Sequence, residues 1–356
     1  MKIRQSLLSV GATVMACAAA FGAVLLVLWA CGYPPLGILH RWLIGAVGNS
    51  YYISNSLAET CPLLLTGLAA GIAFRSGVLN IGAQGQFLIG AMVSVGLATR
   101  WQVTPAVMPT IVIAVVGGAV GGGLWAVLAG ALERWRGVPV VLSTILLNFV
   151  AFYLVEIILS GPLQAHGTSA PQSAEIQGRY WLPVLIKFSS LHIGVLLAFC
   201  LAALLYVVNR QTVFGFQTLV TGLNPRAAQL AGIPVARQQM TVIFVSGGLA
   251  GLGGAFQVLG VTHFLIANFG SYGYAGIAVA LLGRLNPLGI AFSALFFGML
   301  DTGALRVEES SLGLPHNIAD VVKGTVLLVM LLLLAFINRR RISPTAKVDA
   351  AATEGR

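Results

Sequence analysis

Residues 107–132 read VMPTIVIAVVGGAVGGGLWAVLAGAL, a run of 26 residues without a charged side chain. An α-helix needs about 20 predominantly apolar residues to cross the hydrocarbon core of a bilayer. The run is therefore predicted to be a transmembrane helix, and the question for the rest of the chain is how often it crosses the membrane.

The whole chain has the composition of a membrane protein. Of its 356 residues, 58% are hydrophobic and 8% are charged, whereas a soluble domain is about 25% charged. This composition disfavours a soluble enzyme, a secreted domain and a disordered linker. The formal net charge is +10, but the basic residues are scattered singly between apolar runs, so they form no nucleic-acid-binding stripe.

Ten apolar segments are candidate spans. They fall at residues 7–31, 57–74, 78–99, 107–132, 140–160, 191–209, 239–262, 272–284, 287–305 and 318–338. The first resembles a signal peptide, but its apolar run is long enough to span and no polar mature region follows, so we predict an uncleaved helix. The expected fold class is an all-α polytopic membrane protein with about ten transmembrane helices.

The basic residues predict that both termini face the cytoplasm. With ten spans and the N-terminus inside, 14 of the 20 Lys and Arg residues are cytoplasmic, five are outside and one lies within the last span, as the positive-inside rule requires. Residues 161–190 then form a long outer loop and residues 210–238 a long cytoplasmic loop. We divide the chain into an N-terminal helix with an outer loop (1–55), a transmembrane domain (56–340) and a cytoplasmic tail (341–356).

The order of the spans indicates a possible inverted-topology repeat of spans 2–5 and 7–10. Spans two to five begin outside, and spans seven to ten begin inside. The second member of each set is weak, because glycines interrupt residues 77–86 and the segment 272–284 is short. Broken helices at matching positions of two halves are typical of a transport site.

The first motif is RSGVLNIGAQGQ at residues 75–86. Asn80, Gln84 and Gln86 bring amides into or near the membrane, and Asn80 and Gln84 are expected to share a helix face because they are four residues apart. Such amides could bind a neutral polar solute. They could equally be hydrogen-bonding glue between helices.

The second motif is GLNPRAAQLAGI at residues 222–233, in the long cytoplasmic loop. Asn224 is a good N-cap, Pro225 suits the first helical turn, and Gly232 suits a left-handed C-terminal cap. The motif predicts a helix of about two turns whose exposed face could fit a groove in a partner. A capped connector without a partner is the alternative.

Ionisable residues at membrane depth are candidates for function. Glu156 and Asp301 are the clearest, and the amide of Asn148 and the imidazole of His263 are comparable. They could line the path of a solute, or they could make hydrogen bonds inside the helix bundle. Glu59, Asp320 and Lys323 lie near the expected outer boundary, where an ion pair between Asp320 and Lys323 explains both.

These motifs, together with residues 212–216 and 246–254, resemble permease subunits of bacterial ATP-binding-cassette importers of the ribose and branched-chain amino acid type. The similarity is greatest to nucleoside permeases that work with basic-membrane-lipoprotein binding proteins, and it spans roughly residues 55–335. It implies that the second motif is the coupling helix that docks on the ATPase. The coupling residues carried over are Asn224, Pro225, Arg226, Ala227, Ala228, Gln229 and Gly232. Gln84 departs from the family pattern, which often has Glu, and this puts the substrate range in doubt.

The resemblance implies a transport subunit for a small polar solute, a nucleoside or a simple sugar, in the bacterial inner membrane. It also implies ATPase subunits, a second permease (a heterodimer is favoured over a homodimer) and an extracytoplasmic binding protein. The chain contains no Gly-x-x-x-x-Gly-Lys-Ser/Thr loop and no metal-ligand spacing, so we expect no cofactor in it and ATP on the partner subunits. The rival classes are an ion-coupled secondary transporter that uses intramembrane carboxylates, and a membrane scaffold without transport activity.

Overall fold

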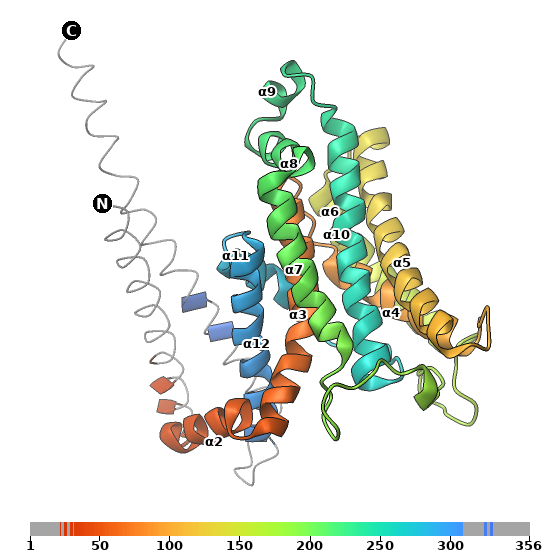
Figure 1. Ribbon diagram of the computed structural model, residues 1–356, viewed down its shortest axis with the longest axis vertical. Coiled ribbons are helices and arrows are strands. Elements are labelled where there is room, and N and C mark those ends of the chain that lie inside the picture. Colours follow the sequence, from red (N-terminus) through yellow and green to blue (C-terminus); the bar gives the residue numbers. More distant parts are fainter. Residues whose placement is uncertain are drawn as a thin grey trace, which may run out of the picture. The chain divides into compact units, whose positions relative to one another are not determined.

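The computed structural model describes residues 32–308 and the isolated positions 22, 25, 26, 29, 30, 324, 325, 328 and 329. This part of the chain is all-α, and its only β-type pairings are isolated bridges (Figure 1). The α-helices are α2 (Pro35–Val47), α3 (Ser50–Arg75), α4 (Ala83–Thr99), α5 (Val107–Arg136), α6 (Val140–Leu159), α7 (Ile193–Gln211), α8 (Val213–Leu223), α9 (Pro225–Leu230), α10 (Val235–Gln257), α11 (Tyr272–Leu282) and α12 (Pro287–Glu308). A 3-10 helix, η1 (Gly178–Tyr180), precedes α7, and a π-helix, η2 (Val258–Thr262), continues α10.

Each of the eight expected spans that fall within residues 32–308 contains a helix. Six helical segments are long and apolar enough to cross a membrane, namely α3, α5, α6, α7, α10 with η2, and α12. The two segments that look weak in the sequence give the short helices α4 and α11. The expected spans 7–31 and 318–338 lie almost wholly outside the described residues, as do Asp320 and Lys323, so the count of ten stays a prediction.

The described chain forms two compact units. The smaller unit contains the described residues up to Gly48 and from Leu300 onward. In it, α2 packs against the end of α12, where the Trp42 indole Nε1 donates to the Leu300 carbonyl at 3.0 Å. The sequence analysis assigned this stretch to an outer loop and missed α2, because a helix of 13 residues is too short to be read as a span.

The larger unit, Asn49–Met299, is built around α3 and α10. Most of both helices is buried, and α10 packs against α3, α4 and α5. Close approach depends on glycine, since a Cβ at Gly251 would lie 2.4 Å from the Gly118 carbonyl oxygen and 2.9 Å from the Gly122 Cα. Small residues of this kind allow membrane helices to pack backbone to backbone.

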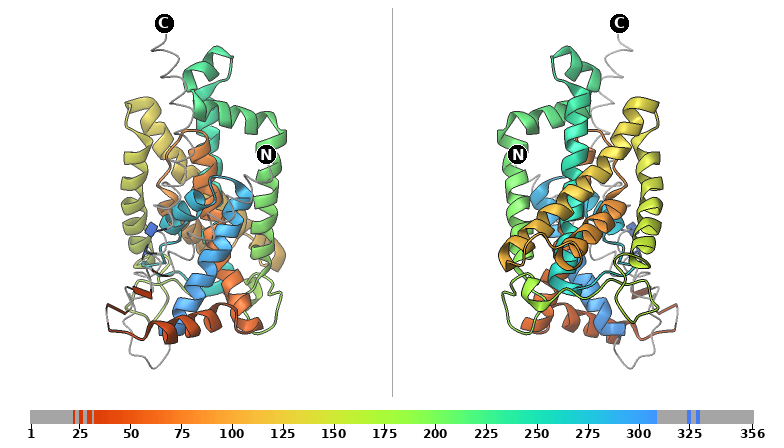
Figure 2. Two further views of the ribbon diagram at one scale, coloured as in Figure 1. Left: turned by 90° about the vertical axis from the view of Figure 1, so that its left-hand side faces the viewer. Right: turned by 90° about the vertical axis from the view of Figure 1, so that its right-hand side faces the viewer.

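Two outer helices flank this core. Figure 2 shows α6 and α7 on opposite sides of α10, and the contacts agree, with α6 against α4 and α5 and α7 against α3. The helix α5 exposes a large apolar side chain at every fourth position: Met108, Val112, Val116, Val120, Leu124, Leu128 and Leu132. A stripe of this length has the character of a lipid-facing surface.

Candidate functional site

The break between α3 and α4 is organised by the side chain of Asn80. Its Nδ2 donates to the Gln86 Oε1 at 3.0 Å and to the Ser246 Oγ at 2.9 Å. Its Oδ1 accepts from the Gly82 amide at 2.9 Å and from the Gln86 Nε2 at 3.0 Å. The Ser246 hydroxyl donates in turn to the Ala69 carbonyl at 2.7 Å. Asn80 therefore joins α3, α4 and α10.

The expectation that Asn80 and Gln84 share a helix face is wrong. The helix α4 begins at Ala83, so Asn80 lies in the non-helical segment before it. The physical reason is the Asn80 side chain itself, which bonds the backbone two residues on and so offers the chain an alternative to helix. Gly77, with a φ of +79°, starts the same turn.

Gln84 connects the starts of two short helices. Its Nε2 donates to the Gly270 carbonyl at 2.7 Å, and its Oε1 accepts from the Gly273 amide at 2.8 Å. A Cβ at Gly273 would lie 2.2 Å from the backbone nitrogen of Gln84, so the backbones of α4 and α11 are in contact there. Both helices begin at this junction, in the interior of the unit.

Asn148 holds α6 against the same junction. Its Oδ1 accepts from the Gly85 amide at 2.8 Å, and its Nδ2 donates to the Ile81 carbonyl at 3.0 Å. The Tyr274 hydroxyl lies 3.4 Å from that Nδ2. The four predicted amides, Asn80, Gln84, Gln86 and Asn148, are thus brought together around the start of α4, and all are buried.

The two predicted carboxylates are not among the hydrogen-bond partners of these amides in the described part of the chain. Glu156 is half-buried on α6, eight residues beyond Asn148, which is about 12 Å along the helix. Asp301 is half-buried on α12 and belongs to the smaller unit. The structure therefore adds neither of them to the amide cluster.

A polar network that the sequence analysis missed lies at the far end of α10 from α9. The Tyr272 hydroxyl donates to the Glu59 Oε2 at 2.8 Å and accepts from the Gln257 Nε2 at 3.2 Å. Only Glu59 carried a signal in the sequence, as a charge beside an apolar run. Gln257 and Tyr272 carried none, because their role depends on the contact between Tyr272 and Glu59, which are 213 residues apart.

The long loop at residues 161–190 is hydrogen-bonded to η2 beside this network. The Leu182 amide donates to the Leu259 carbonyl at 2.9 Å, and the Trp181 ring stacks on His263 at 3.6 Å. The His192 Nδ1 accepts from the Gly194 amide at 3.1 Å at the start of α7. Burial lowers the pKa of His263, so this imidazole is neutral at pH 7.

The predicted cytoplasmic helix is present as α9 (Figure 1). The Asn224 Oδ1 accepts from the Ala227 amide at 3.1 Å, Pro225 occupies the first turn, and Gly232 has a φ of +81°. These features confirm the helix and both of its predicted caps. Leu230 is 92% exposed, whereas Ala228 is fully buried. Ala228 therefore lies on the face of α9 that packs against the rest of the unit.

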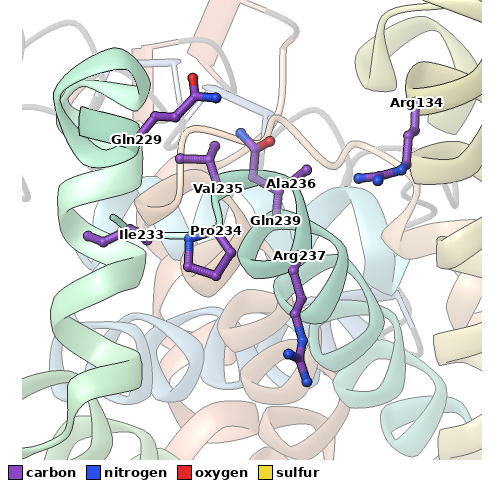
Figure 3. A pocket seen from close by; sticks show the side chains of 8 residues that line it. All are labelled: Arg134, Gln229, Ile233, Pro234, Val235, Ala236, Arg237 and Gln239. Atoms are coloured by element: carbon purple, nitrogen blue, oxygen red, sulfur yellow. The ribbon is translucent and has the colours of Figure 1, made fainter. Parts of the chain in front are cut away.

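A hollow of about 460 Å³ lies beside α9. Figure 3 shows its lining side chains, which come from α5, α9, the turn after α9 and the start of α10. They are Arg134, Gln229, Ile233, Pro234, Val235, Ala236, Arg237 and Gln239. Arg134 extends from α5 toward the start of α10 (Figure 3), and with Arg237 it gives this end of the unit a positive charge that suits acidic side chains.

The helix before α9 touches the break before α4. A Cβ at Gly222, near the end of α8, would lie 2.1 Å from the Arg75 carbonyl oxygen and 2.9 Å from the Gly77 amide nitrogen. Contact this close leaves little room for α8 to shift without moving the turn that leads to Asn80.

Comparison with known proteins places these features in a family. Residues 52–331 match the family described as the branched-chain amino acid transport system / permease component. The chain belongs to this family. The permease is therefore a multi-pass membrane transport component and not an enzyme.

Several relatives are similar to the permease over most of their length. The guanosine ABC transporter permease protein NupP of Bacillus subtilis is 32% identical over 80% of this chain and 82% of its own. The nucleoside permease protein NupB of Lactococcus lactis is 31% identical (86% and 87%), and the glucose permease protein TsgB13 of Haloferax volcanii is 30% identical (93% and 88%). A second permease from each of the first two organisms, NupQ or NupC, is also similar, at 29% and 28% identity. No solved structure is significantly similar to the permease.

The bonds of Gln84 lead to a first prediction. Gln84→Leu should lower the melting temperature of the purified permease by about 5 °C or more, because it leaves the Gly270 carbonyl and the Gly273 amide unpaired at about 1–3 kcal/mol each. The control is Gln102→Leu. Gln102 follows α4, and its Nε2 donates to the nearby carbonyl of Ala98, in the last turn of that helix, so this substitution should have little effect on the melting temperature. An unchanged melting temperature with altered uptake affinity would instead make Gln84 a solute ligand.

Proposed function

We propose that this permease is the membrane-spanning subunit of an ATP-driven importer for a nucleoside or a related sugar. A separate ATPase would bind at α9 and supply the energy. The observation that carries the proposal is α9 itself, a helix of six residues that is capped at both ends and presents Leu230 outward. A short helix with an exposed apolar side chain suits a groove in a partner.

The contacts within the larger unit offer a route for the motion. ATP binding would draw the ATPases together and shift α9, and α8 would shift with it. Gly222 would pass the shift to the turn at Arg75 and Gly77, which leads directly to Asn80 and the start of α4. Since Gln84 joins the starts of α4 and α11, both short helices would respond together, and the amide cluster would thereby shape the solute path.

The remaining partners follow from the family and from the paired relatives. We propose a heterodimer with a second permease, because Bacillus subtilis and Lactococcus lactis each have two similar permeases. ATP would be bound by the ATPase subunits, and a binding protein would deliver the solute outside the inner membrane. Cytoplasmic N- and C-termini, the inverted repeat and the roles of Glu156 and Asp301 in the solute path remain predictions.

The names of the relatives favour an uncharged hydroxylated solute. They specify guanosine, nucleosides and glucose, and guanosine and glucose both carry adjacent sugar hydroxyls. Few charges lie at membrane depth to balance a charged solute, so this permease suits the same chemistry.

Reconstituted transport tests the proposal. The permease, its ATPase and its permease partner would be placed in proteoliposomes with the binding protein outside, and uptake of labelled guanosine and glucose would be measured. We expect uptake of one of them that requires ATP on the ATPase side and survives collapse of the ion gradients. Uptake driven by a sodium or proton gradient without ATP would contradict the proposal and favour an ion-coupled transporter.

A further inference from the structure

The network of Glu59, Tyr272 and Gln257 lies where three elements meet. Glu59 is on α3, Gln257 is the last residue of α10, and Tyr272 is the first residue of α11. The helix α10 has 23 residues and is therefore about 34 Å long, with α9 preceding its start. The network is thus at the opposite end of the larger unit from α9, on the side of the long outer loop (Figure 1).

One acceptor in this network is unused. Gln257 is 3% exposed, and its Oε1 is buried without a hydrogen-bond partner in the described part of the chain. A buried amide oxygen without a donor destabilises the folded state, because it has given up its hydrogen bonds to water and formed none within the protein. Glu59 and Tyr272 are half-buried, so the network borders an accessible part of the unit.

Aromatic side chains stand beside the polar groups. The Phe87 ring lies 5.8 Å from the Phe269 ring in a stacked arrangement and 5.4 Å from the Tyr272 ring. The π-helix η2 begins directly after Gln257, and π-helical turns are frequent at functional sites. An apolar wall with a few convergent polar groups is the usual form of a small-molecule site.

The geometry points to a site for adjacent hydroxyl groups of an uncharged sugar moiety, formed by Glu59, Gln257 and Tyr272. The inference rests on the proposed function and adds the residues that select the solute. The buried Gln257 Oε1 accepts a hydrogen bond from one hydroxyl, and the Glu59 carboxylate, which also accepts from Tyr272, accepts from the neighbouring hydroxyl. The same carboxylate repels anions, so the site favours neutral ribosides and sugars over phosphorylated ones.

The test compares solutes that differ only in their hydroxyls. The complete permease–ATPase complex would be placed in nanodiscs without the binding protein, and binding of labelled guanosine would be competed with 2′-deoxyguanosine and 2′,3′-dideoxyguanosine. We expect dideoxyguanosine to compete at least tenfold more weakly than guanosine, because it leaves the buried Gln257 Oε1 unpaired and loses the hydrogen bond to Glu59. Glu59→Gln, which keeps the shape of the side chain and an acceptor for Tyr272, should reduce this ratio to twofold or less.

Two further variants make the result decisive. Tyr272→Phe should also lower the ratio, and it provides a second measurement if Glu59→Gln does not fold. The matched control is Thr66→Val, which removes the 3.0 Å bond from the Thr66 hydroxyl to the Tyr272 carbonyl without touching the polar groups, and it should keep the wild-type ratio.

The outcomes separate this inference from the proposed function. If the complex takes up guanosine but Glu59→Gln and Tyr272→Phe keep the wild-type ratio, the proposed hydroxyl site is rejected. The proposal that the chain is part of an importer is then unaffected. A complex that takes up guanosine but does not bind it in nanodiscs, or does not distinguish the competitors, also overturns the site. If the wild-type complex takes up neither guanosine nor glucose, both proposals fail.

Discussion

Leu230→Glu is expected to reduce ATP-driven uptake at least a hundredfold while the permease still inserts and folds. Leu230 is 92% exposed on α9, so the substitution disturbs little within the chain. In a docked complex, the same position would lose the burial of a leucine, about 1.5–3 kcal/mol, and would place an unpaired charge in an apolar groove. The measurement is uptake by the reconstituted transporter, together with its rate of ATP hydrolysis.

The control for this prediction is Leu230→Met, which conserves volume and hydrophobicity and should keep uptake within about threefold. Normal uptake by Leu230→Glu at normal expression would show that the ATPase does not bind α9. Arg226→Glu combined with Ala228→Glu would be a less informative variant. Ala228 is fully buried, so a glutamate there would disrupt the packing of α9. A loss of uptake would then not distinguish lost docking from misfolding.

Gly251→Ala is expected to lower the stability of the permease markedly. Its Cβ would lie 2.4 Å from the Gly118 carbonyl oxygen, so α5 and α10 would have to separate along the middle of the larger unit. Overpacking of a tight core costs about 1–3 kcal/mol or more, and we expect the melting temperature of the purified permease to fall by about 5 °C or more.

Gly248→Ala is the matched control, because it lies on the same helix with its nearest neighbour, the Ala119 carbonyl oxygen, 3.4 Å from the added Cβ. It should leave the melting temperature within about 2 °C, since alanine also favours helix. Equal effects of the two substitutions would mean that the α5–α10 contact is not as close as the structure has it.

Local rules account for the part of the fold that could be predicted from the sequence. Apolar runs of sufficient length became helices because a membrane span must satisfy its own backbone. Asn224, Pro225 and Gly232 could be assigned in advance because capping depends on a few neighbouring residues. The glycines at residues 77–86 likewise indicated an interrupted helix, although the start of α4 at Ala83 did not follow from them.

Contacts between distant segments account for what could not be predicted. Tyr272 and Glu59 are 213 residues apart, and nothing near either residue indicates the other. The amides of Asn80 and Gln84 were recognised as candidates, but their partners on α10 and before α11 were not visible in the sequence. The short helix α2 was missed for a related reason, since it rests on Trp42 packing against the end of α12 and not on a long apolar run.

The most direct test of the central claim is to purify the permease by affinity from its native membrane in mild detergent and to identify the proteins that accompany it. An ATPase bound through α9 and a second permease are required if the chain is one subunit of an ATP-driven importer. We therefore predict that both are recovered with the wild-type chain and that the ATPase is lost with Leu230→Glu. Recovery of the wild-type chain alone, from a preparation shown to preserve known ATPase complexes, would contradict the account.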